Sequence, residues 1–268
     1  MAVSTSASRV RTVLAGGPIT VDITVDPDDI VAVQHLRYRV FADEPGFSDA
    51  IGDRLAQRDA DRFDEYCEHL VVRHADDGLI GCARLLAPPR AMAAGGWYTA
   101  TEFDVRGLDE IGSATVEMGR ACVAGAHRSG AATALMWAAI LAYLDDNGYD
   151  HLVGCVSVPL GGAWERGATL RGVRDVLRDK HSAPWDVQPH TAPMVDGRPL
   201  DDIDPPASVV LPPLLRAYLR LGARVCGDPA VDEVFDVGDF VTVLDRAGTN
   251  KRYLDRLRSA ATRLAPQG

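Results

Sequence analysis

The stretch of residues 114–144 constrains the fold of this chain more than any other part of its sequence. Its first part, Ala114–Val123, has the pattern of a β-strand, and a short loop with Gly125 and Gly130 leads into a long apolar helix over about residues 129–146. A helix that is apolar nearly all round is buried on most sides, so we expect it to lie against a sheet. A strand, a glycine-containing turn and a helix N-terminus together form a place where phosphate can be held.

The same strand carries two charged residues, Glu117 and Arg120, among apolar neighbours. Charges in an apolar strand are costly unless they are paired or used. Strict strand alternation would place the two side chains on opposite faces of the sheet. Gly119 lies between them, however, and a glycine inside a strand often marks a β-bulge. We therefore expect a bulge there, which would bring both side chains to one face.

Composition and charge exclude several classes of protein. The 268 residues are 47% apolar and 25% charged, as in an ordinary globular protein. The net charge of −10 argues against general nucleic-acid binding, which needs a basic surface. The five cysteines show no CxxC spacing, so we expect buried thiols in a reducing compartment and no metal site. No segment reaches the roughly 18 continuous apolar residues of a membrane span, and no signal peptide is evident, so we expect a cytoplasmic protein.

The order of helical and extended patterns predicts an α/β (α+β) domain around one mixed sheet, with a parallel strand–helix–strand unit at its centre. We expect residues 1–17 to form a loose N-terminal arm and residues 18–250 to form the domain. Within it, residues 159–213 are rich in proline, and we interpret them as an insertion that covers a substrate or lies on the surface. Residues 251–268 are expected to form a C-terminal amphipathic helix and tail.

Six charged residues stand in apolar or tightly patterned contexts, and they comprise three cations and three anions: Arg37, Asp61, Asp64, Arg84, Glu117 and Arg120. Arg37 falls on the apolar stripe of the helix predicted over about residues 27–43, whereas Arg39 falls on its far side. Two interpretations stay open at this point. The six residues form a buried ion network that only holds the fold, or they form a site that binds and activates a substrate.

Several motifs, in this order along the chain, are similar to those of GNAT-type long-chain N-acyltransferases, in particular the L-ornithine Nα-acyltransferases of ornithine-lipid synthesis. They lie at residues 36–41, 61–72, 81–86, 102–104, 117–123, 154–157 and 211–223. The likeness covers about residues 30–245. A fainter resemblance links the chain to the acyl-homoserine-lactone synthases, in which a similar charged set shapes the amine-substrate side; it corresponds here to Arg37, Phe41, Asp61, Asp64, Arg84, Phe103, Glu117 and Arg120.

The resemblance implies a GNAT acyltransferase fold, with a mostly antiparallel mixed sheet, a splayed central strand pair and flanking helices. Acyl-phosphopantetheine, carried by an acyl carrier protein or by CoA, would enter the opening as co-substrate, and no permanently bound cofactor is expected. The backbone N–H groups of Ala121, Cys122 and Val123 would polarise the thioester carbonyl. The phosphate loop would comprise His127, Arg128, Ser129, Gly130 and Ala132. This loop matches the usual GNAT pattern only in part, which favours a carrier-protein donor over full CoA.

We assign catalytic roles to Glu117, as the first candidate for the base, and to Arg120 and Asp64. Carboxylates would grip a cationic amino acid, while arginines would take its carboxylate. The expected substrate-binding residues are Arg37, Phe41, Asp61, Arg84, Phe103, Ala121, Cys122, Val123 and Ser157. His69 is another candidate base, although a lone strand histidine is more often structural. Cys122 and Cys155 resemble nucleophiles, but we interpret them as core residues.

The expected function is transfer of a long-chain, 3-hydroxylated fatty acyl group from an acyl carrier protein to the α-amino group of ornithine or a similar amino acid. The basic C-terminal helix would either touch anionic lipid at the membrane surface or pack on the core. Three alternatives remain at this stage: a synthase of N-acyl amino acids or acyl-homoserine lactones, a small acetyl-CoA-dependent N-acetyltransferase, and a catalytically silent GNAT-fold binding protein.

Overall fold

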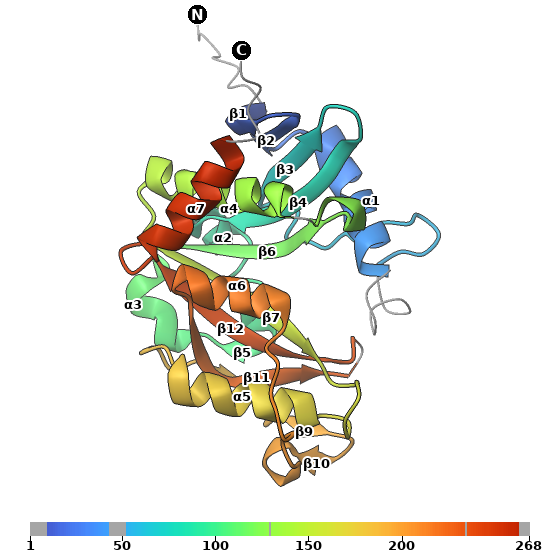
Figure 1. Cartoon of the computed structure of the whole chain (residues 1–268), viewed down its shortest axis with the longest axis vertical. Helices are drawn as coiled ribbons and strands as arrows, with labels where there is room; N and C mark the ends of the chain where they lie inside the picture. Colours follow the sequence, from blue (N-terminus) through green and yellow to red (C-terminus); the bar gives the residue numbers. More distant parts are fainter. Residues whose placement is uncertain (1–9, 43–51, 129, 234, 263–268) are drawn as a thin grey trace, which may run out of the picture.

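An eight-stranded sheet forms the centre of the computed structural model, which describes residues 10–42, 52–128, 130–233 and 235–262 (Figure 1). Every pair of neighbouring strands is antiparallel except β6 and β7, which are parallel. The order across the sheet is β1 (Val10–Gly16), β2 (Ile19–Thr24), β3 (Glu68–His74), β4 (Gly78–Leu86), β6 (Thr115–Val123), β7 (His151–Pro159), β12 (Val237–Asp245) and β11 (Arg224–Asp232).

The central strand–helix–strand unit forms as the sequence predicts. Helix α4 (Ala131–Asn147) connects the two parallel strands, and its side chains are buried on nearly every side. It carries no charged residue before Asp145, so the whole helix can be covered by apolar partners. The helix ends at Gly148, whose φ of 71° lies in the left-handed region that glycine adopts without strain.

Strands β6 and β7 separate shortly after they begin to pair. Their register covers only Thr115–Glu117 against His151–Val153, and beyond that the two strands diverge. Gly154 lies at the point of separation, where a Cβ atom would stand 2.4 Å from the carbonyl oxygen of Met118. Only glycine allows this close approach. The predicted splayed central strand pair is confirmed.

Strand β6 also contains the predicted bulge. Its partner register moves from Cys82 opposite Cys122 to Arg84 opposite Gly119, so β6 holds one extra residue in this interval. Within it, Arg120 has a φ of 52°, a conformation that a residue with a Cβ atom seldom adopts. The bulge turns the Arg120 side chain toward Tyr98, whose backbone N–H also binds Glu117. Both charges therefore reach the same segment, on one face of the sheet.

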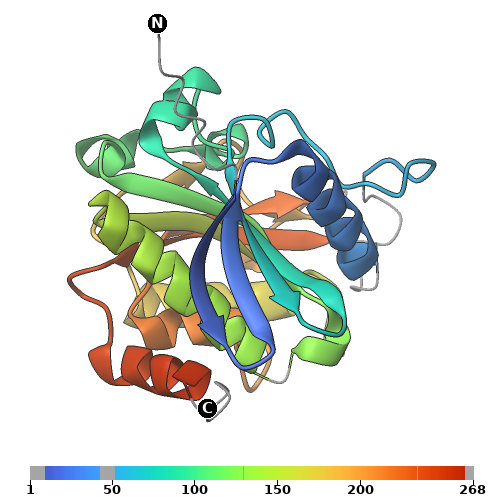
Figure 2. The ribbon, with the colours of Figure 1, turned by 90° about the horizontal axis from the view of Figure 1, so that it is seen from above.

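Helices cover both faces of the sheet, and Figure 2 shows α1 and α4 on opposite sides. One face packs against α4 and the helices that follow it, which are α5 (Ala168–Lys180), α6 (Pro213–Leu221) and α7 (Lys251–Thr262). The other face packs against α1 (Pro27–Ala42), and α2 (Pro88–Ala93) and α3 (Asp109–Gly112) lie in the loop-rich region on that side. None of the described helices is both long and apolar enough to cross a membrane.

The expectation of a loose arm over residues 1–17 is wrong for its second half. Val10–Gly16 forms strand β1, which pairs with β2 through a tight turn at Gly17, where φ is 59°. The strand is held because Val13 and Leu14 pack on the main core. Residues 1–9 lie outside the described part of the chain.

The proline-rich stretch 159–213 is folded around one helix, α5, which packs on β7 and β11. Its prolines stand among short extended pieces, β8 (Gln188–Pro189), β9 (Met194–Val195) and β10 (Arg198–Pro199). Strand β8 pairs with β5 (Phe103–Asp104), which fixes the stretch to the loop before β6.

Candidate active site at the strand separation

Six charged side chains form what we call the buried ion network: Arg37, Asp59, Asp61, Asp64, Arg84 and Arg120. At its centre, both guanidinium NH groups of Arg37 bind Asp64, at 2.9 and 2.8 Å, and the Nε atom lies 2.9 Å from Asp59. Arg37 is 1% exposed. Burial alone would raise the pKa of Asp64, but its hydrogen bonds with Arg37 hold that pKa well below its usual range.

The two other arginines extend the network toward the strand separation. Arg84 donates from NH1 to Asp61 at 2.6 Å and to Asp64 at 3.1 Å. Arg120 lies 3.2 Å from Asp59 and 3.4 Å from Asp61. The side chain of Arg120 is 23% exposed, against 3% for Arg84 and 1% for Arg37. Of the three arginines, Arg120 is therefore the one with a surface left for a substrate.

Glu117 lies outside this network, although the sequence grouped it with these residues. Its carboxylate accepts hydrogen bonds from the backbone N–H groups of Tyr98 and Thr99, at 2.6 and 2.7 Å, and from the Thr99 hydroxyl at 2.5 Å. Burial raises the pKa of Glu117, and these hydrogen bonds oppose that effect. A carboxylate with these hydrogen bonds holds the 98–99 segment in place. The sequence did not indicate this contact.

The other candidate bases and nucleophiles are packed against neighbouring groups. His69 is buried, its Nε2 lies 3.1 Å from the Asp64 carbonyl oxygen, and burial lowers its pKa. Cys122 lies 3.7 Å from Cys82, sulfur to sulfur, and its pKa is raised well above the usual value by that contact and by burial. Burial does the same to Cys155. Protonated thiols are weak nucleophiles, so the structure favours core roles for these cysteines, as expected.

A second cluster of carboxylates, which we call the acidic group, consists of Glu102, Asp232 and Asp239. Burial, followed by the charges of Asp239 and Asp232, raises the pKa of Glu102 to about 7. Burial raises the pKa of Asp239 to about 6, opposed by a hydrogen bond of 2.6 Å from the Ser157 hydroxyl. The Oε2 atom of Glu102 is buried without a hydrogen-bond partner among the described residues.

The acidic group lies beside β7 and near Arg120. Ser157 and Asp239 are register partners on β7 and β12, and Arg120 lowers the pKa of both Glu102 and Asp239 through its charge. Sequence reasoning noticed Glu102 only as part of a family motif and did not notice Asp239. It placed Ser157 among the substrate-binding residues, and the structure brings Ser157 to this cluster.

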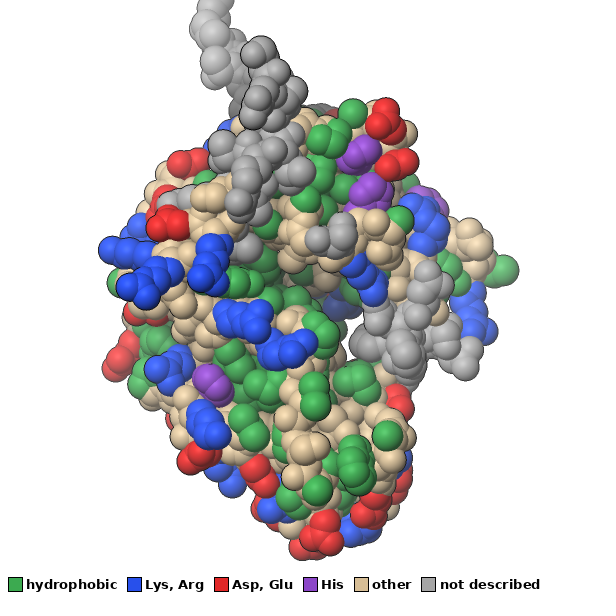
Figure 3. Space-filling view, viewed as in Figure 1, with side chains coloured by type: hydrophobic (Ala, Val, Ile, Leu, Met, Phe, Trp, Pro, Cys, Tyr) green, Lys and Arg blue, Asp and Glu red, His purple; other side chains and the backbone are tan. Residues whose placement is uncertain are grey.

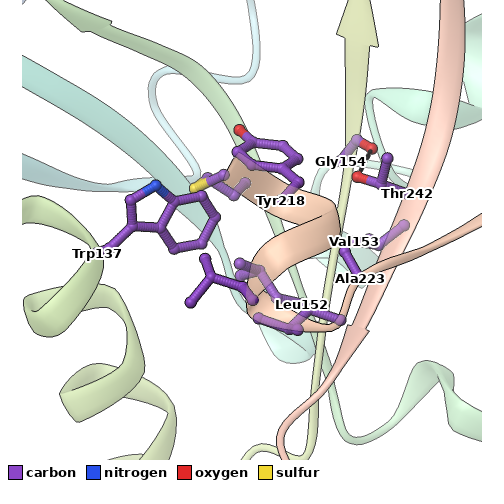
Figure 4. A pocket seen from close by; sticks show the side chains of 10 residues that line it. Trp137, Leu152, Val153, Gly154, Tyr218, Ala223 and Thr242 are labelled. Carbon is purple, nitrogen blue, oxygen red and sulfur yellow. Dashed lines mark hydrogen bonds between the residues drawn. The ribbon is translucent and has the colours of Figure 1, made fainter. Parts of the chain in front are cut away.

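On the opposite face of the sheet, an apolar pocket opens where the strands separate (Figure 4). It is lined by Met118, Trp137, Leu152, Val153, Gly154, Tyr218, Leu221, Ala223, Thr242 and Leu244. The rings of Trp137 on α4 and Tyr218 on α6 meet edge to face, with centroids 4.9 Å apart. None of these ten residues belongs to the 159–213 stretch. Helix α6, which follows that stretch, contributes Tyr218 and Leu221 to the pocket lining.

Tyr218 is a functional candidate that sequence reasoning missed. It is 5% exposed, and burial raises its pKa, as does the charge of Cys155. A buried tyrosine hydroxyl beside the strand separation can give a proton to a developing thiolate. Tyr143 and Tyr149 are less suited to this task, because the Tyr143 hydroxyl donates to Glu68 at 2.6 Å and the two rings stack on each other.

Cys155 marks where the two faces meet. Its sulfur lies 3.7 Å from the Thr99 hydroxyl on the side of the acidic group, and its charge raises the pKa of Tyr218 on the side of the pocket. Strand β7 thus lies between an apolar pocket on one face and a cluster of carboxylates on the other. This arrangement suits a reaction between an apolar thioester and a cationic amine.

Comparisons with known proteins agree with this geometry. A family model described as the acetyltransferase (GNAT) domain matches residues 36–138. The L-ornithine Nα-acyltransferase of Brucella abortus (strain 2308) is 32% identical over 246 residues, which cover 87% of this chain and 86% of the relative. The chain belongs to the L-ornithine Nα-acyltransferase family. The enzyme of Rhizobium meliloti (strain 1021) is also 32% identical, over 88% of this chain and 83% of its own length.

Members of this family are acyltransferases, and so is this enzyme. A solved structure, the CoA-dependent acyl-homoserine lactone synthase BjaI with MTA, has a TM-score of 0.50 and 16% identity, over 90% of this chain and 85% of that chain. This likeness supports the predicted GNAT fold. GNAT acyltransferases use acyl thioesters as co-substrates.

The other residues expected to bind substrate lie on α1, on β6 and in the core. Phe41 lies on α1 and packs beside the core cluster under that helix, and Phe103 is 1% exposed within the core under β7 and β12. Ala121, Cys122 and Val123 lie on β6 beyond its last residue paired with β7. In this interval β6 has no register partner on β7.

The predicted phosphate loop has a short 3-10 turn, Gly125–His127, before α4 begins at Ala131. The His127 ring lies 3.2 Å from Asp77, and the Nε atom of Arg128 donates to the Val123 carbonyl at 3.0 Å. Gly130 precedes the helix with a φ of 113° and gives no side-chain cap, and Ala132 is buried in the first turn. Ser129 lies outside the described residues.

Basic side chains gather on the surface over α6 and α7 (Figure 3). Five cations on these two helices are exposed: Arg216, Arg220, Lys251, Arg252 and Arg256. The two helices contact each other, and α6 is also the helix that carries Tyr218 into the pocket. This local positive surface contrasts with the net charge of −10 of the whole chain.

Proposed function

We propose that this enzyme transfers a long-chain, 3-hydroxylated acyl group from an acyl-carrier-protein thioester to the α-amino group of ornithine or a similar diamino acid. The product would be a lyso-ornithine-lipid type N-acyl amino acid. The observation that carries the proposal is the opposition of an apolar pocket and an acidic group across the separated strands β6 and β7. The names of the family members at 32% identity support the choice of acceptor.

The acidic group favours an acceptor with more than one ammonium group. Glu102, Asp232 and Asp239 place three carboxyls together, and burial, followed by repulsion from Asp239 and Asp232, raises the pKa of Glu102. A cation bound among them would relieve that repulsion. Arg120 stands next to the group with an exposed surface, and its planar fork suits the carboxylate of an amino acid.

Within this proposal, Glu102 accepts the proton that the acceptor ammonium must lose before it attacks. The amine nitrogen then bonds to the thioester carbonyl carbon, and the carbon–sulfur bond breaks. Tyr218 gives its proton to the leaving thiolate, and the tyrosinate takes back the second proton that the nitrogen loses as the amide forms. Backbone N–H groups near Ala121, Cys122 and Val123, where β6 has no register partner on β7, stabilise the oxyanion. Glu117 positions the 98–99 segment between these groups, and its filled hydrogen bonds favour this role over that of a base.

Two features favour a carrier protein as donor. His127 and Arg128 are engaged with Asp77 and the Val123 carbonyl, which leaves mainly the first turn of α4 to hold a phosphate. A pantetheine arm on a carrier protein presents one phosphate there. The basic surface over α6 and α7 suits an acidic partner, and the same surface would permit peripheral contact with anionic lipid.

The test is mass spectrometry of the purified enzyme with 3-hydroxyhexadecanoyl carrier protein or the matching acyl-CoA, and with an equimolar mixture of amino acids. The proposal predicts N-acyl-ornithine from the carrier-protein donor at a rate well above that from CoA. Acylation of amino acids without a side-chain cation would overturn the acceptor assignment. Equal use of CoA would overturn the donor assignment, and absence of thioester consumption would overturn the activity itself.

A further inference from the structure

The side chain of Trp137 is 4% exposed, and its indole N–H has no hydrogen-bond partner among the described residues. A buried donor without a partner is uncommon in folded proteins because water is lost without replacement. This N–H belongs to a residue that lines the apolar pocket at the strand separation. One residue of the pocket wall therefore holds a buried donor without a partner among the described residues.

The other polar groups of the wall differ from this one. The Thr242 hydroxyl donates to the Gly154 carbonyl at 2.9 Å, which occupies its hydrogen. The Tyr218 ring packs edge to face against the Trp137 ring, so both polar tips belong to the same end of the pocket (Figure 4). An indole N–H only donates, so a partner for Trp137 must bring an acceptor oxygen.

The position of Trp137 limits which part of a ligand could bring that oxygen. The pocket is lined by Met118 and Gly154, which approach each other where β6 and β7 part. A thioester between the separated strands would send its acyl chain into the pocket past these two residues. The first carbons after the thioester would then pass close to the Trp137 ring.

We propose that Trp137 is a specificity-determining residue for the acyl donor, and that its indole N–H donates a hydrogen bond to an oxygen at carbon 3 of the acyl chain. The pocket then favours a 3-oxygenated chain over an unsubstituted chain of the same length, because the latter leaves the N–H unpaired. This inference rests on the proposed function, in which an acyl thioester enters between β6 and β7.

The first experiment compares 3-hydroxyhexadecanoyl and hexadecanoyl carrier protein as donors, by kcat/KM, in the parent enzyme and in Trp137→Phe. Phenylalanine keeps an aromatic ring and removes the N–H. We expect the preference for the hydroxylated donor to fall about tenfold, as for the loss of one hydrogen bond in a dry pocket. Trp164→Phe, at a residue that is 54% exposed, is the matched control and should keep the parent preference. An unchanged preference in Trp137→Phe would overturn the proposal.

A second experiment needs no variant and no turnover. Amide analogues of acyl-pantetheine that carry a 3-hydroxy, a 3-oxo or an unsubstituted C16 chain are titrated into the parent enzyme by calorimetry. Since the indole N–H only donates, the 3-hydroxy and 3-oxo analogues should bind alike and about tenfold tighter than the unsubstituted one. Equal binding of all three, or preference for 3-hydroxy alone, would overturn the assignment to Trp137.

The two experiments separate failure of this inference from failure of the proposed function. If no donor is consumed but the analogues bind in the expected order, the acyl-transfer proposal fails and the role of Trp137 stands. If N-acyl-ornithine forms at equal rates from both donors, the function stands and the role of Trp137 fails.

Discussion

The buried ion network and the acidic group are both clusters of charge near β6, yet they differ in how their hydrogen bonds are satisfied. In the network, Arg37 and Asp64 are joined by paired hydrogen bonds of 2.8–2.9 Å. In the acidic group, the Oε2 atom of Glu102 is buried with no partner among the described residues, and three carboxyls repel one another. Under the proposed function, the buried ion network holds the fold, and the acidic group, in which Glu102 has the unpartnered oxygen, binds the substrate.

The largest expected effect is on stability, when the buried ion network is disrupted. Arg37→Ala should lower the free energy of unfolding by about 3–5 kcal/mol, because it removes the central buried cation that binds both Asp64 and Asp59. Chemical denaturation followed by circular dichroism measures this loss. Arg39→Ala, on the same helix at an exposed position, is the matched control and should cost less than about 1 kcal/mol. Equal stability of the two variants would show that the network does not stabilise the fold.

The next largest effect is on kcat, when Glu102 of the acidic group is changed. Glu102→Gln should lower kcat by about 10²–10³-fold, the range expected for loss of a general base. Glu110→Gln, at an exposed position nearby, should leave kcat unchanged. A Glu102→Gln variant with more than a tenth of the parent kcat would show that another group takes the proton.

The same variant should gain stability at alkaline pH. Because the pKa of Glu102 is raised from 4.5 to about 7, the folded state holds a proton that the unfolded chain releases between these values. The contribution of Glu102 to stability is therefore fully present below about pH 4.5 and is lost as the pH rises through 7. Thermal denaturation should give Glu102→Gln the higher Tm at pH 8 and a smaller advantage at pH 5. A lower Tm at pH 8 would mean that Glu102 is stabilised by a partner.

A smaller effect is expected at the pocket. Tyr218→Phe should lower kcat by about tenfold, since a thiolate is a good leaving group and needs little help from an acid. Tyr143→Phe is the control: its hydroxyl binds Glu68, so its loss should reduce stability and leave kcat nearly intact. Steady-state kinetics with one donor and saturating acceptor distinguishes them, and a larger kcat loss in Tyr143→Phe would contradict the assignment.

The smallest effect concerns the choice of acceptor. Asp239→Asn should raise the KM for ornithine about fivefold, the loss expected from one partly screened charge pair. Norvaline has the same backbone without the side-chain ammonium, and its inhibition constant against ornithine should not change. A parallel rise for both amino acids would place Asp239 outside the acceptor pocket.

Much of the fold followed from local patterns. The apolar run of α4 and the strands around it could be recognised because burial on all sides leaves a continuous apolar sequence. Gly119 between two charges predicted the β6 bulge, which the register confirms. Strand β1 was missed because its seven residues include Arg11 and depend on packing of Val13 and Leu14 on a core formed elsewhere.

The site was less accessible from sequence. The network residues Arg37, Asp64 and Arg84 stood out because a charge in an apolar pattern needs a partner. Asp59 lies in a loop, where a carboxylate is unremarkable, yet it binds two of the arginines. Tyr218 is 100 residues from Met118, and only the return of α6 to the strand separation makes them neighbours. Pattern alone also cannot show that the N–H of a tryptophan in an apolar helix has no partner among the described residues.

The measurement that tests the central claim most directly is the pH dependence of kcat/KM in the parent enzyme, Glu102→Gln and Glu117→Gln. If the unsatisfied carboxylate takes the proton, the parent rate should rise with pH through about 7, where Glu102 loses its proton. Glu117→Gln should be slower but keep this rise, because Glu117 only positions Tyr98 and Thr99. Glu102→Gln should lose it. A rise that survives in Glu102→Gln and disappears in Glu117→Gln would contradict the account.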